Sequence, residues 1–126
     1  MLNAARLTAF AATAHPDRAR AFYGNTLGLQ LRYEDEFALS FEANGTELRI
    51  QKVEKVQPHP YTTLGWTVTD IDSTVQSLSS RGVIFERYPF MEQDLLGVWS
   101  APGGAKVAWF KDPDGNLLSV AEYPSG

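Results

Sequence analysis

Apolar and polar residues alternate in short runs along this chain, a pattern that predicts several strands and two helices. Residues 7–13 are apolar and rich in small side chains, and they predict a first strand. Pro16 stands at a helix start, and apolar residues follow at helical spacing until Leu27-Gly28 ends the helix. Asn44-Gly45 predicts a hairpin turn, because both residue types tolerate the left-handed backbone angles that such turns require. The remaining strands of this half are predicted at residues 29–33, 37–42 and 46–53.

The second half repeats this order of strand, helix and three further strands. Pro58 and Pro60 stiffen a connector, and residues 62–68 then predict a strand. Asp70 caps a helix that has one apolar stripe, and Arg81-Gly82 ends that helix. The later strands are predicted at residues 83–88, 107–110 and 117–120. We therefore expect one domain over residues 1–126, built from two similar units at about 5–56 and about 61–124.

Composition places the chain among ordinary globular proteins. Its 126 residues are 44% hydrophobic and 21% charged, which is enough for one domain with a core. A net charge of −4 argues against binding to nucleic acid or to anionic membranes, because both require a dense basic surface. The chain has no cysteine, which excludes disulfides and thiolate chemistry, and no run approaches the roughly 18 apolar residues of a membrane span. We expect a cytoplasmic protein.

The segment Asp112-Pro113-Asp114-Gly115-Asn116 lies between two apolar runs and predicts a tight hairpin. In the first half, Phe22-Tyr23 is followed by Leu27-Gly28-Leu29. Together with the repeated unit, these motifs resemble those of the glyoxalase, bleomycin-resistance and extradiol-dioxygenase superfamily, also called vicinal oxygen chelate proteins, from about Leu7 to Tyr123. The resemblance implies an α+β fold. In that fold two tandem βαβββ units form a U-shaped mixed or antiparallel sheet with the helices on its outer face.

The same resemblance implies where a metal would be held. Metal-using members bind a divalent ion through His, Gln or Glu on the first and last strands of each unit. The corresponding positions in this sequence are Thr8, Arg49, Thr63 and Ser119. Neutral hydroxyls bind divalent transition metals poorly, and a guanidinium repels a cation. Glu47, Gln51 and Glu122 are oxygen donors nearby, but Glu47 and Gln51 would still require partners from Thr8, Thr63 or Ser119. The two histidines, His15 and His59, are expected in exposed loops. We therefore expect no metal and no other cofactor.

Alternation along the strands predicts an apolar and aromatic cleft that binds a small organic molecule. If the vacated ligand positions face the cleft, Phe10 faces it too, whereas Leu7 and its alternate neighbours pack under the helix. Trp66 belongs to the core by the same argument, and the resemblance supplies the remaining apolar members. The alternative is that these aromatic residues fill the interior and leave no pocket. The predicted ligand-binding residues are Phe10, Phe37, Leu39, Phe41, Arg49, Gln51, Thr63, Trp99, Val107, Trp109 and Ser119.

Two features have two interpretations each. Arg49 either pairs with Glu47 or Glu122 across strands, or binds an anionic group of a ligand. Residues 90–104 either form a flap over the cleft, or include one more strand at residues 97–100 that Trp99 anchors to the sheet.

The expected function is binding rather than catalysis. Bleomycin-resistance-like members, which sequester a drug without chemistry, are the nearest analogy, and such members commonly form homodimers. The unpaired edges of an open sheet are a physical reason to expect that association. The rival class is an enzyme: a metal-dependent glyoxalase-like lyase, epimerase or dioxygenase, or a metal-free acid/base catalyst using Glu47 or Glu122. A third possibility is a domain whose cleft is filled and whose surface carries the function.

Overall fold

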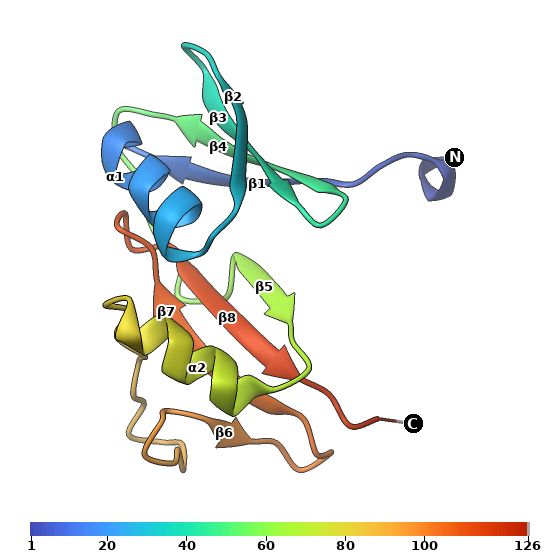
Figure 1. Ribbon diagram of the computed structural model, residues 1–126, viewed down its shortest axis with the longest axis vertical. Coiled ribbons are helices and arrows are strands. Elements are labelled where there is room, and N and C mark those ends of the chain that lie inside the picture. The colour runs from blue at the N-terminus through green and yellow to red at the C-terminus, as the bar shows by residue number, and fades with distance from the viewer. Residues whose placement is uncertain (126) are drawn as a thin grey trace. The chain divides into compact units, whose positions relative to one another are not determined.

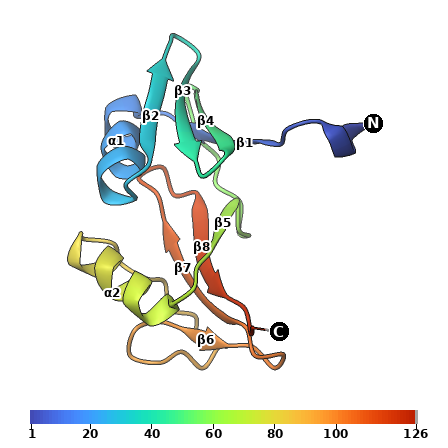
Figure 2. The ribbon, with the colours of Figure 1, turned by 45° about the vertical axis from the view of Figure 1, so that its right-hand side comes forward.

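The computed structural model describes residues 1–125, and the chain divides into two compact units, Met1–Pro58 and His59–Gly126. Each unit has one four-stranded mixed sheet with a helix against one side of it (Figures 1 and 2). The predicted α+β fold of tandem βαβββ units is therefore confirmed. Among the described residues, no helix is long and apolar enough to cross a membrane.

The first unit has the strand order β1-β4-β3-β2, in which β1 is parallel to β4 and the other neighbours are antiparallel. Pro16 occupies the first turn of its helix, where the missing N–H costs nothing. Asn44 (φ 52°) and Gly45 (φ 94°) make the left-handed turn that joins two strands. The elements are the 3₁₀ helix η1 (Leu2–Ala4), β1 (Thr8–Thr13), α1 (Pro16–Ala21), the π-helical turn η2 (Phe22–Thr26), β2 (Gln30–Glu34), β3 (Ala38–Ala43) and β4 (Thr46–Lys52).

The core of the first unit lies between its sheet and its helix. The rings of Tyr23 in η2 and Phe41 in β3 lie 5.8 Å apart, and both are fully buried. Burying an aromatic or aliphatic side chain of this size contributes roughly 1.5–3 kcal/mol. Leu7 does not join this core: it precedes β1 and is 75% exposed, so the prediction that it packs under the helix was wrong.

The second unit repeats the topology with the order β5-β8-β7-β6. Its helix begins as predicted, because the Asp70 carboxylate accepts a hydrogen bond from the backbone N–H of Ser73. Glu122 also accepts one from the N–H of Ile71. The predicted hairpin is confirmed as well: Asp112 accepts from the backbone N–H of Asn116, and Gly115 has φ 88°. The elements are β5 (Leu64–Thr67), α2 (Ile71–Ser80), β6 (Trp99–Ser100), β7 (Lys106–Lys111) and β8 (Leu117–Glu122).

One predicted strand is absent. Residues 83–88 are irregular apart from an isolated bridge between Phe85 and Phe110. The Gln93 side chain takes the backbone groups that a strand would have used, since it accepts from the N–H of Tyr88 and donates to the carbonyl of Glu86. The fourth strand of the sheet comes later instead: Trp99–Ser100 forms β6, so the strand interpretation of this region is confirmed for those two residues.

Candidate functional site

Four of the residues predicted for a ligand site lie on the face of the second sheet that does not meet its helix: Trp99, Val107, Trp109 and Ser119. In the ladder, Trp99 lies opposite Val107, Trp109 opposite Ser119, and Ser119 opposite Gly65. Alternate residues such as Phe110 and Leu118 point to the helix side and are buried. Trp66 pairs with Val120 on that same helix side and is half-buried. We call Trp99, Val107, Trp109, Ser119 and Gly65 the open face of the second sheet.

Aromatic rings gather on this open face. The rings of Trp99 and Trp109 lie 6.0 Å apart with 35° between their planes. Tyr88 meets Trp109 edge to face at 5.8 Å and lies 5.6 Å from Phe90. Burial, helped by the nearby Glu86 carboxylate, raises the pKa of Tyr88. Such a cluster presents apolar surface together with ring edges and faces against which a planar molecule can stack.

A small gap in side-chain volume lies beside the rings. Gly65 has no side chain, and a Cβ at this position would lie 2.9 Å from the Ser119 Oγ. Among residues 1–125, every side-chain nitrogen or oxygen that is shielded from water has a hydrogen-bond partner. The Ser119 hydroxyl has no such partner in that range. The Ser119 Oγ is therefore open to water although the residue is only 8% exposed.

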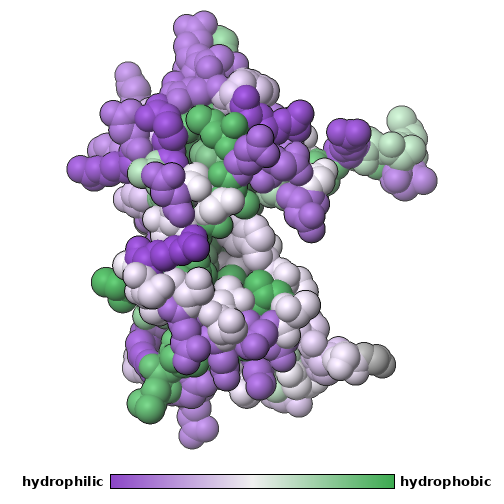
Figure 3. All heavy atoms as spheres, in the orientation of Figure 1, coloured by the Kyte–Doolittle hydropathy of each residue, from purple (hydrophilic) through white to green (hydrophobic). Residues whose placement is uncertain are grey.

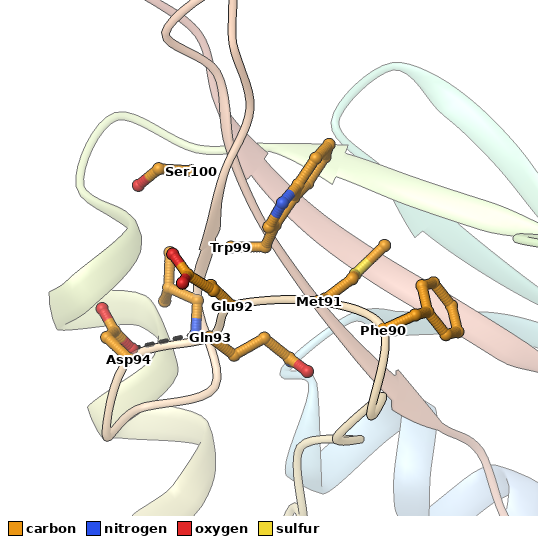
Figure 4. A pocket seen from close by; sticks show the side chains of 8 residues that line it. Phe90, Met91, Glu92, Gln93, Asp94, Trp99 and Ser100 are labelled. Carbon is orange, nitrogen blue, oxygen red and sulfur yellow. Dashed lines mark hydrogen bonds between the residues drawn. The ribbon is translucent and has the colours of Figure 1, made fainter.

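An open hollow of about 740 Å³ adjoins Trp99 along residues 90–100. Figure 4 shows Met91 and Trp99 projecting to the same side of this segment, away from the carboxylate of Asp94. The backbone here is firmly held: Asp94 accepts from the N–H groups of Leu96 and Val98, and Arg87 donates to the carbonyls of Asp94 and Leu95. The hollow is lined by Phe90, Met91, Glu92, Gln93, Asp94, Val98, Trp99 and Ser100.

The corresponding face of the first sheet is polar. Arg49 Nη1 donates to the Tyr33 hydroxyl at 2.7 Å and lies 3.4 Å from Glu47 Oε2, while Ser40 donates to that same carboxylate oxygen at 2.7 Å. The Ser40 hydrogen bond lowers the pKa of Glu47; burial opposes this and Arg49 reinforces it. Burial alone would lower the pKa of Arg49, but Tyr33 and Glu47 outweigh it and raise that pKa. Hydrophilic residues also predominate on the visible surface of this unit (Figure 3).

Of the two glutamates proposed as partners of Arg49, only Glu47 lies beside it, and two other predicted site residues share its face. Glu47 pairs with it, whereas Glu122 accepts from the N–H of Ile71 at the start of α2. Phe10 lies opposite Arg49 on β1, and Gln51 is two residues further along β4, so both share its face.

Leu39 and Phe41 do not share the face of Arg49, and the prediction that they do was wrong. Arg49 lies opposite Ser40, which turns the alternate residues Leu39 and Phe41 toward the helix, where both are fully buried. A shift of one residue in register moves every side chain to the other face of a strand, and the sequence pattern alone does not fix that register. Phe37 precedes β3 and is 67% exposed.

The sequence did not single out several side chains that organise the two faces. Tyr33 and Ser40 form the network around Arg49, and Tyr88 and Gln93 hold the aromatic cluster and its loop. Ser40 carried a sequence signal, as the one hydroxyl between the apolar residues Leu39 and Phe41.

The positions at which the resemblance implies metal ligands hold hydroxyls and a guanidinium, none of which is a usual ligand of a divalent transition metal. Thr63 lies just before β5, where its N–H donates to the carbonyl of Leu117. Across the part of the chain that the structure describes, no three His, Asp or Glu side chains come close enough together to hold a metal ion.

Two tandem βαβββ units, each with one helix-covered and one open sheet face, define the class of fold. The model of the Glyoxalase/Bleomycin resistance protein/Dioxygenase superfamily matches residues 6–120, and the chain belongs to that superfamily. Comparison with curated proteins found no match.

Solved structures agree with this assignment of the fold. A superfamily member from Sphaerobacter thermophilus DSM 20745 has 26% identity and a TM-score of 0.73, covering 97% of this chain and 99% of that one. A glyoxalase/bleomycin resistance protein/dioxygenase from Alicyclobacillus acidocaldarius has 20% identity, a TM-score of 0.72, and coverage of 97% and 93%. Lactoylglutathione lyase from Agrobacterium tumefaciens has 16% identity, a TM-score of 0.72, and coverage of 94% and 93%.

Proposed function

We propose that this protein binds a small organic molecule through an apolar or aromatic group, on the open face of its second sheet, without a metal. The observation that carries the proposal is the pair of indoles, Trp99 and Trp109, 6.0 Å apart beside an open hollow. Aromatic surface of this kind, with few polar groups such as the free Ser119 hydroxyl, is typical of a small-molecule site. The residue types at Thr8, Arg49, Thr63 and Ser119 support the metal-free part of the proposal.

Calorimetric titration with 1-naphthol, a neutral planar probe, tests the binding site. Trp109→Leu should weaken binding by about tenfold or more, because stacking and buried ring area are lost together. Trp66→Leu is the matched control, since it makes the same chemical change on the helix side of the same sheet. Equal effects of the two substitutions would contradict the proposed site.

The rival function is a metal-dependent lyase, epimerase or dioxygenase, which membership of the superfamily keeps open. Elemental analysis separates the two, because the metal-free proposal expects no stoichiometric Zn, Ni, Mn or Fe in dialysed protein. About one metal ion per chain would favour the enzyme.

We also propose that the protein forms a homodimer. In each sheet two strands lie at an edge, β1 and β2 in the first and β5 and β6 in the second. Unpaired strand edges favour association. Light scattering at tens of micromolar should report a dimer, and a monomer there would contradict this part of the proposal.

A further inference from the structure

The guanidinium of Arg49 in the first unit uses only one of its three nitrogens. Nη1 donates to the Tyr33 hydroxyl and faces Glu47, whereas Nε and Nη2 have no hydrogen-bond partner among residues 1–125. In that same range, every side-chain nitrogen or oxygen that is shielded from water has a hydrogen-bond partner. Nε and Nη2 are therefore open to solvent, on a side chain that is otherwise only 24% exposed.

These two nitrogens form the side edge of the guanidinium. The N–H bonds of Nε and Nη2 on this edge run parallel, at the spacing of the two oxygens of a carboxylate. Tyr33 and Glu47 both bind at Nη1, so they hold the side chain in place and leave the edge free. A guanidinium that is already positioned loses less conformational entropy when it binds an anion.

Apolar and hydroxyl groups flank this edge on the same face. Phe10 is the partner of Arg49 in the parallel ladder of β1 and β4, and it is 49% exposed. Thr8, two residues earlier on β1, has a hydroxyl with no hydrogen-bond partner in the described chain. The face thus combines a bidentate donor, an exposed ring and a free hydroxyl.

We propose that the Nε/Nη2 edge of Arg49 binds the carboxylate of a small ligand whose apolar part rests against Phe10. This site belongs to the first unit and does not depend on the proposed aromatic site of the second. The negative charge of Glu47, 3.4 Å from Nη1, lowers the affinity for an anion without occupying the edge. Glu47 therefore weakens anion binding, so removing its charge should tighten binding. If Arg49 served only its ion pair with Glu47, removing that charge would not tighten binding.

Nuclear magnetic resonance of the whole protein tests the site, with benzoate as probe and benzamide as its neutral analogue. Benzoate should shift the Arg49 Nε–H signal and the backbone signals of Thr8 and Phe10 in a saturable manner, and benzamide should bind at least about tenfold more weakly. Similar titration curves for the two probes would overturn the proposal.

Four variants complete the experiment. Arg49→Met should weaken benzoate about tenfold or more, and Arg49→Lys, which keeps the charge but loses the edge, should also weaken it. Arg32→Met, in which another arginine of the same sheet is replaced, should leave benzoate binding unchanged. Glu47→Gln should tighten binding about threefold or more, because it removes the competing charge.

Unchanged signals of the core residues Tyr23 and Phe41 would show that each variant is folded. Benzoate shifts that persist in Arg49→Met, or weaker benzoate binding in Glu47→Gln, would show that Arg49 serves only its ion pair with Glu47.

Discussion

The two units share one topology but carry opposite chemistry on their open faces. Across the first sheet, one row of neighbours runs Phe10, Arg49, Ser40 and Tyr33. The corresponding row of the second sheet runs Gly65, Ser119 and Trp109. Phe10 on the edge strand β1 thus corresponds to Gly65 on β5. Arg49 on the inner strand β4 corresponds to Ser119 on β8.

The ion pairs follow the same division. Five ion pairs lie within the first unit, and in the second Lys111 lies 3.5 Å from Glu86. All three tryptophans lie in the second unit. The helix-covered faces of both units hold buried apolar cores, whereas the open faces differ in the side chains that they present.

The largest expected effect tests whether the two cores are equivalent. Phe41 and Phe110 lie on the helix side of corresponding strands and are 0% and 1% exposed. Each packs against another ring, Tyr23 at 5.8 Å and Phe85 at 5.5 Å. Phe41→Ala and Phe110→Ala should each lower the free energy of unfolding by about 3–5 kcal/mol in urea denaturation, because each leaves a cavity. If one substitution lowered the free energy of unfolding by less than half as much as the other, the two cores would not be equivalent.

A smaller effect distinguishes the charged unit. Glu34 accepts three hydrogen bonds from Arg20 and lies 2.7 Å from Lys52 Nζ. Glu34→Gln should cost about 1 kcal/mol at neutral pH, a figure that allows for solvent screening because the Arg20 side chain is 39% exposed. The matched change in the second unit, Glu86→Gln, should cost less than about 0.5 kcal/mol, since its partner Lys111 is 3.5 Å away and 53% exposed.

The cost of Glu34→Gln should depend on pH. Hydrogen bonds from Lys52 and then Arg20 lower the pKa of Glu34 from its ordinary value of 4.5. A group whose pKa is lower in the folded state contributes stability in full above its unfolded pKa and loses it as the pH falls through the folded pKa. We therefore expect the difference in free energy of unfolding between the unaltered protein and Glu34→Gln to be complete above about pH 4.5. It should decrease as the pH falls further, which denaturation from pH 7 downward would measure. A constant difference at all pH values would mean that lost packing, and not charge, causes the effect.

The smallest effect concerns the gap on the second open face. A Cβ at Gly65 would lie 2.9 Å from the Ser119 Oγ, an atom that rotation of one bond can move aside. Gly65→Ala should therefore cost less in a Ser119→Ala background, with a coupling free energy of about 0.5 kcal/mol in a double-mutant cycle. Strict additivity would show that the two residues do not compete for the same space.

Local sequence rules predicted the turns and caps of both units. Asn44-Gly45, Asp70 and the Asp112 hairpin each act through residues within four positions, so the residue types alone fix their geometry. The strand predicted at 83–88 failed for a nonlocal reason, because the Gln93 side chain binds the backbone there.

The candidate site was harder to predict than the fold. The resemblance to the superfamily placed Trp109 and Val107 on the same face as Ser119, and the ladder of β7 and β8 shows that the three share a face. Leu39 and Phe41 were placed on the wrong face, because the pairing of Ser40 with Arg49 depends on the register between β3 and β4. The periodicity of one strand does not specify its register with the neighbouring strand.

The most direct experiment asks whether the two open faces bind different ligands. It follows one protein sample with two probes. The indole N–H signals of the three tryptophans and the Arg49 Nε–H signal are recorded while 1-naphthol and then benzoate are titrated. We predict that 1-naphthol shifts the Trp99 and Trp109 signals and leaves Trp66 unchanged, and that benzoate shifts the Arg49 signal. Movement of Trp66 by 1-naphthol with Trp99 and Trp109 unchanged, together with an Arg49 signal indifferent to benzoate, would contradict this prediction.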